Sequence, residues 1–124
     1  MTVSITTQNY SQITKRILHD SSINSTIVNN VVLSSCKIYN LEIDNTGAGT
    51  PTAVYLKIWD SKNPTLGVDD PDYVIMISAN VKRNMSILSG LTISNGLSYA
   101  CTKVASMDDA TDPDTVVQLR MIVE

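Results

Sequence analysis

The chain has 124 residues, a formal net charge of −3 and a hydrophobic fraction of 43%, with no phenylalanine. This length supports one domain with an aliphatic core and excludes two separate cores. The nine Lys and Arg residues are scattered, which argues against nucleic-acid binding. No apolar run reaches the roughly 20 residues of a membrane helix, and the first residues lack the pattern of a secretory signal. We therefore expect synthesis in a cytoplasm and no membrane partner.

Residues 1–20 are predicted to form an N-terminal arm, and residues 21–124 a single β-domain. Within the arm, residues 11–18 fit a short helix through Ile13, Ile17 and Leu18, and they fit an extended segment equally well. The Thr-rich start MTVSITTQNY suits an arm that adds a strand to a neighbouring subunit or hooks onto it. The candidate anchors on this arm are Val3, Ile5 and Tyr10.

Strands are predicted over residues 25–33, 36–44 and 53–60. In the last of these, aliphatic residues alternate with Tyr55, Lys57 and Trp59. Such alternation predicts a half-buried strand with one solvated face.

After a loop over residues 61–72, the predicted strands cover residues 73–79, 85–88, 97–104 and 116–123. The first of these is apolar on both faces, which predicts cover on both sides, as in the interior of an oligomer. Ser89-Gly90 is expected to end the short second strand, and Asn95-Gly96 predicts a tight turn before the third.

Seven or eight short strands separated by turn residues, with almost no helix, favour an all-β fold. The predicted architecture is an antiparallel β-sandwich or jelly roll with an extended N-terminal arm, and a small barrel is the competing architecture. Cys36 and Cys101 are far apart in apolar segments. They could pair across two sheets, but we expect two buried thiols.

No catalytic constellation is present in the sequence. His19, Asp20 and Ser21 are adjacent, so they cannot converge as a base, an orienting group and a nucleophile must. One histidine and two distant cysteines cannot supply a zinc site, and the glycines lack the spacing of a dinucleotide loop. We therefore expect no enzymatic activity, no metal and no cofactor.

Two acidic stretches, residues 69–72 and 108–114, carry the carboxylates that calcium prefers. Neither has EF-hand spacing, and Pro71 and Pro113 account for the turns without an ion. Solvated loops are the expected structure.

Tyr55 and Trp59 lie on the same predicted strand face. Two interpretations are open: the rings cover the second side of a sheet, or they form an exposed aromatic anchor for a protein partner, since Trp and Tyr are enriched at binding hot spots.

Five short stretches carry a resemblance to a known family. They are Asp44-Asn45-Thr46, Tyr55-Leu56-Lys57-Ile58-Trp59, Pro64-Thr65-Leu66-Gly67, Asp70-Pro71 and Gly96-Leu97-Ser98-Tyr99-Ala100. Their order and spacing resemble a family of small virion proteins of tailed bacteriophages, over about half of the chain. Residues 1–35 and the stretch NMSILSGL (84–91) depart from the family pattern.

The resemblance implies a non-enzymatic β-sandwich or jelly-roll component of the virion. The first hypothesis is a capsid decoration (cement) protein that stabilises the head by bridging major capsid subunits. A trimer would match the local threefold points of the capsid lattice, since closed cyclic symmetry is common in oligomers. The alternatives are a neck, tail or fibre-base component, and a glycan-binding adhesion module using Trp59, Tyr55 and Asp60.

Overall fold

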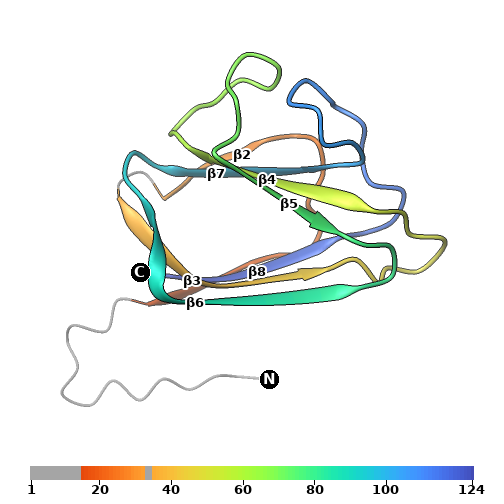
Figure 1. Cartoon of the computed structure of the whole chain (residues 1–124), viewed down its shortest axis with the longest axis horizontal. Coiled ribbons are helices and arrows are strands. Elements are labelled where there is room, and N and C mark those ends of the chain that lie inside the picture. The colour runs from red at the N-terminus through yellow and green to blue at the C-terminus, as the bar shows by residue number, and fades with distance from the viewer. Residues whose placement is uncertain (1–14, 33–34) are drawn as a thin grey trace.

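The computed structural model describes residues 15–32 and 35–124, which form two antiparallel four-stranded sheets packed face to face (Figure 1). The strands are β1 (Arg16–Asp20), β2 (Val28–Val32), β3 (Cys36–Asp44), β4 (Val54–Asp60), β5 (Tyr73–Ile77), β6 (Lys82–Ile93), β7 (Leu97–Thr102) and β8 (Gln118–Val123). The described residues contain no helix. The predicted all-β sandwich is confirmed.

Successive strands alternate between the two sheets. One sheet has the order β1-β8-β3-β6 and the other the order β2-β7-β4-β5. Among the described strands, only the β4–β5 connection stays within one sheet. The strands β5 and β6 are edge strands of different sheets, and they face each other at one side of the sandwich, where both line one groove.

The space between the sheets is filled by aliphatic side chains, as the absence of phenylalanine predicts. The fully buried members include Ile38, Leu41, Ile43, Leu56, Ile58, Ile77, Leu97 and Leu119. A polar bond in this layer joins the two sheets: Tyr99 Oη in β7 donates to Asp20 Oδ2 in β1 at 2.8 Å. Burial raises the pKa of the Tyr99 hydroxyl, and the bond to Asp20 raises it further, so the phenol stays protonated.

Both cysteines are buried free thiols, as the sequence predicts. Burial raises the pKa of the Cys101 thiol to about 12. It therefore acts as a small hydrophobic side chain.

Two predictions about the elements are wrong. The sequence predicts that residues 16–20 belong to the arm, with a helix as one option for residues 11–18, yet Arg16–Asp20 form β1 and pair with β8. The anchors Val3, Ile5 and Tyr10 lie outside the described residues. The Ser89-Gly90 pair does not end a strand, because β6 continues through it to Ile93.

Candidate protein-interaction site

The outer face of β4 is buried, although the alternation of residues 53–60 predicts a solvated face. Trp59 is 1% exposed and Lys57 is fully buried. Both residues point away from the core of the sandwich, since their β7 partners Ser98 and Ala100 alternate with core residues. The small size of these partners leaves room for the loops to close over the sheet.

Trp59 is covered by the loop between β4 and β5. Its indole Nε1 donates to the carbonyl oxygen of Asp69 at 2.9 Å. The loop is braced from within, because the Thr65 amide donates to Asp69 Oδ2 at 2.7 Å, and the Asp69 amide donates to the Thr65 carbonyl at 2.9 Å. Trp59 is thus the anchor of its own loop and offers no ring to a partner.

Lys57 is covered by the loop between β7 and β8. Its ammonium Nζ donates to the Ser106 carbonyl oxygen at 2.5 Å. Burial lowers the pKa of Lys57, and the nearby carboxylates of Asp109 and Asp108 partly oppose this. Asp109 also accepts from the Val104 amide at 3.1 Å, which closes the loop over the lysine.

Of the two predicted aromatic anchors, only Tyr55 keeps partial exposure. Trp59, Tyr55 and Asp60 therefore do not form an exposed aromatic shelf. The first interpretation, in which Trp59 covers the second side of the sheet, matches the structure.

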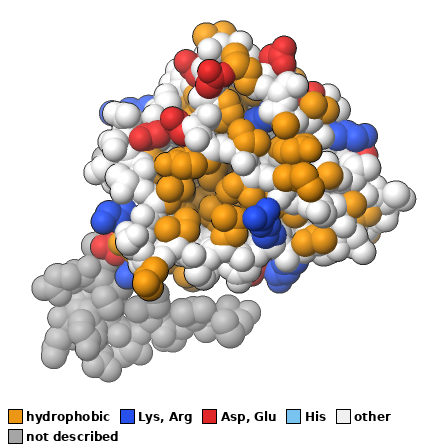
Figure 2. All heavy atoms as spheres, in the orientation of Figure 1, with side chains coloured by type: hydrophobic (Ala, Val, Ile, Leu, Met, Phe, Trp, Pro, Cys, Tyr) orange, Lys and Arg blue, Asp and Glu red, His pale blue; other side chains and the backbone are white. Residues whose placement is uncertain are grey.

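An apolar groove opens instead between the edge strands β5 and β6. It measures about 340 Å³ and is lined by Asp72, Tyr73, Val74, Ile75, Met85, Ile87 and Leu91, with Leu41 of β3. Figure 2 shows hydrophobic side chains gathered on this face of the molecule. An exposed apolar patch of this kind is typical of a surface that binds another protein.

The outer face of β5 extends this apolar surface. Val74 and Met76 pair with Lys57 and Tyr55 of β4, yet they remain 44% and 46% exposed. Among the described strands, β5 has a hydrogen-bonded neighbour on one side only. The sequence predicts that both faces of this strand are covered. Within the single chain, its outer face therefore lacks that cover.

A wide bulge in β6 forms the other wall of the groove. Ile38 of β3 pairs with Leu91 and Asn40 pairs with Ser86, so that Tyr39 alone faces residues 87–90. The bulge pushes Leu88 outward until it is 99% exposed.

The polar groups at the rim of the groove are already engaged. Arg83 Nη1 donates to the Met76 carbonyl at 2.8 Å, and Asp72 Oδ2 accepts from the Asp60 amide at 2.7 Å. The site therefore offers a partner an apolar surface and the unpaired edge of a strand. These two polar side chains at its rim are not directed at an ion or a sugar.

Sequence reasoning missed Leu88 and the groove. The signal was present at β5, where Tyr73–Ile77 is apolar on both faces although a strand with one buried face would alternate.

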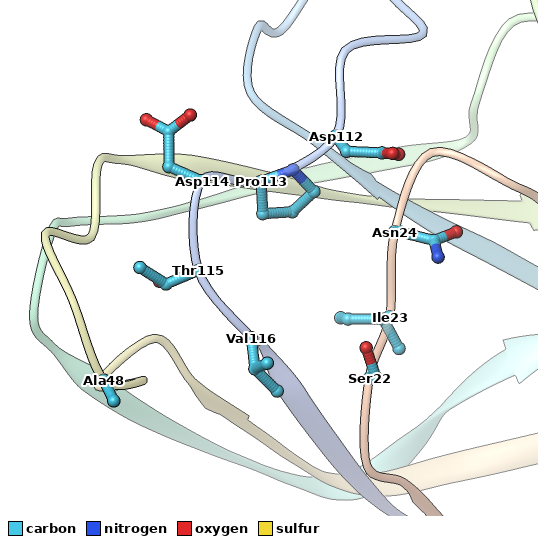
Figure 3. Close-up of a pocket in the computed structure, with 9 residues that line it drawn as sticks. All are labelled: Ser22, Ile23, Asn24, Ala48, Asp112, Pro113, Asp114, Thr115 and Val116. Carbon is cyan, nitrogen blue, oxygen red and sulfur yellow. The ribbon is translucent and has the colours of Figure 1, made fainter.

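The acidic stretches act as turn braces. Asp112 Oδ1 accepts from the Ser25 amide at 3.0 Å, and Asp114 pairs with Lys103 Nζ at 2.8 Å. Figure 3 shows the polar hollow of about 400 Å³ beside them, lined by residues 22–24, Ala48 and residues 112–116. Within residues 15–32 and 35–124, no group of three or more His, Cys, Asp or Glu side chains is placed to hold a metal.

His19 lies on the exposed outer face of the other sheet. Its Nε2 is 3.2 Å from Gln118 Oε1. The adjacent Asp20 binds Tyr99 on the opposite side of β1, so the two side chains do not meet.

No protein-family model, no curated protein and no solved structure matches this chain. In the part of the chain that the structure describes, no helix is long and apolar enough to cross a membrane.

Proposed function

We propose that the protein is a capsid decoration (cement) protein of a tailed bacteriophage, which stabilises the head by bridging major capsid subunits. The observation that carries a binding role is the apolar groove between β5 and β6, whose aliphatic lining remains open on an otherwise well-packed sandwich. The five sequence stretches that resemble small virion proteins support placing this binding role on a phage particle.

The position of the groove supports a role specific to this chain. Its β6 wall is built from Met85, Ile87 and Leu91, within the stretch that departs from the family pattern. The motif residues, by contrast, serve packing and turns, as Trp59 and Thr65 do. We assign the binding of a protein segment to the groove and folding to the motif residues. A glycan-binding role is not proposed, because it requires an exposed Trp59.

The test is the copy number of the protein in purified virions of the phage that encodes it. Quantitative mass spectrometry against the major capsid protein should give a high copy number, comparable to that of the capsid subunit, in a constant ratio across preparations. A count that fits a single ring at the portal or tail would contradict the decoration role. It would place the protein among neck, tail or fibre-base components, which is the second candidate.

A further inference from the structure

We propose that the β5–β6 groove binds residues 1–14 of a neighbouring copy of the same chain, which add as a strand along the free edge of β5. This inference deepens the proposed function by naming the contact that holds copies together. Each copy would donate its N-terminal segment and accept one.

The groove has the form that strand addition requires. It lies between two edge strands, so that an added segment can pair its backbone with one edge and place alternate side chains between the sheets. Leu41 at its floor belongs to the main core, and an inserted aliphatic side chain would extend that core.

The composition of residues 1–14 matches this surface. The segment MTVSITTQNYSQIT carries no charged side chain and is rich in Thr, Val and Ile, which favour strands. Val3 and Ile5 are two residues apart and separated by Ser4, so both would face the groove while polar residues face solvent. The strand that receives them, Tyr73–Ile77, is also uncharged.

The apolar surface beyond the groove favours a neighbouring copy. Val74 and Met76 lie on the outer face of β5 and are 44% and 46% exposed. A segment of the same chain in the groove would leave this face open, whereas a second molecule could cover it with its own surface. Lys15 precedes β1 at the edge of the sheet opposite β6, and the chain from Ile5 to Lys15 spans up to about 33 Å when extended, which reaches a molecule lying beside β1. The same length exceeds the roughly 15 Å across the four strands of its own sheet, so the mixing experiment below decides between the two grooves.

The experiment is a complementation test on the full chain by light scattering after size exclusion. The donor variant carries Val3→Asp and Ile5→Asp, and the acceptor variant carries Val74→Glu. The matched control is Val116→Glu, because Val116 is a similarly exposed valine at 52%, away from the groove. Circular dichroism checks that each variant is folded.

We expect the unmodified chain and Val116→Glu to form oligomers, and the donor and acceptor variants to be monomers of 13.5 kDa. An equimolar mixture of the two variants should restore association and give a mass twice that of the monomer, because one variant keeps the intact arm and the other keeps the intact groove. A segment docked on its own chain could not be rescued by mixing.

The inference is overturned if the unmodified chain is monomeric, if either variant stays oligomeric, if Val116→Glu also dissociates, or if the mixture remains monomeric. These outcomes leave the copy number in virions untouched. The failure of this inference is therefore distinguishable from the failure of the proposed function.

Discussion

At the scale of single residues, Asp60 joins two segments of the fold that are far apart in the sequence. It ends β4 in one sheet and holds the corner at which the chain passes from β6 to β7. The Ser94 amide donates to both carboxylate oxygens at 3.0 Å, and the Asn95 amide donates to Oδ1 at 2.7 Å. Burial alone would raise the pKa of Asp60, but these donors and the Gly96 amide outweigh it and lower the pKa below the ordinary value of 3.8.

Replacing Asp60 by Asn should lower the free energy of unfolding by about 2 kcal/mol at neutral pH, because charge-assisted hydrogen bonds become weaker neutral ones. A carboxyl with a lowered folded-state pKa stabilises the protein above its unfolded-state pKa, and this stabilisation disappears as the pH falls through the folded-state value. Urea unfolding of both proteins at pH 7 and at pH 3 measures the difference.

The matched control for this prediction is Asp70→Asn, on the exposed part of the β4–β5 loop. It should leave the unfolding free energy nearly unchanged. If Asp60→Asn and Asp70→Asn were equally stable at pH 7, the corner would not depend on the Asp60 charge.

At the scale of elements, the bulge in β6 depends on one glycine. Gly90 has a φ of +80°, and a Cβ at this position would lie 3.0 to 3.1 Å from the side chains of Lys37 and Tyr39. The same bulge exposes Leu88 and shapes one wall of the groove. The Ser-Gly pair that looks like the end of a strand is therefore the means by which the strand changes register.

Substituting Gly90 by Ala should cost about 2 kcal/mol or more of stability, from backbone strain and side-chain crowding together. Gly67→Ala is the comparison, because Gly67 has a similar φ of +83° but its Cβ would meet only ordinary contacts from 3.5 Å. It should cost about 1 kcal/mol. Equal melting temperatures for the two variants would show that crowding at the bulge contributes nothing.

The sequence predicted the strands well where one face is buried and the other faces solvent. The predicted bounds of residues 36–44 are those of β3. Asn95-Gly96 lies between β6 and β7 as expected, but it forms a bend that joins the two sheets and not the tight turn of a hairpin. The prediction of a solvated face failed at β4, because periodicity depends only on the residues of a strand and not on the loops that fold over it. Lys57 and Trp59 are buried by loops from distant parts of the chain, through bonds to Ser106 and Asp69.

The groove was beyond sequence reasoning for a different reason. It depends on β5 and β6 lying at the same side of two different sheets, which follows from the strand order. Residues such as Val74 and Met85 are ordinary aliphatic strand residues in sequence. Only the apolar character of both faces of β5 hinted that this strand needs a partner.

At the scale of the whole molecule, the two sheets have distinct inner and edge strands, and amide hydrogen exchange should reflect this. The inner strands β3, β8, β4 and β7 should exchange most slowly. The strands β5 and β2 are the two edges of the same sheet and provide an internal comparison. Raising the protein concentration should slow exchange in β5 and leave β2 unchanged, because only β5 would gain a strand from another copy.

Mass spectrometry of peptides after exchange at two concentrations makes this measurement. The donor variant with Val3→Asp and Ile5→Asp should remove the concentration dependence of β5. Protection of β5 that is independent of concentration would contradict the addition of a strand from a second molecule.

The strands β1 and β6 occupy opposite edges of one sheet. Lys15, which follows the N-terminal segment, precedes β1 at one edge, and the groove lies beside β6 at the other. Two copies that exchange segments reciprocally satisfy both contacts across a twofold axis, whereas a segment passed on to a third copy makes a heterologous contact. Repetition of the heterologous contact either closes into a ring or continues as an open chain, and the angle between successive copies decides which. The number of subunits in a closed assembly of this protein would thus be set by the short link between residue 14 and β1.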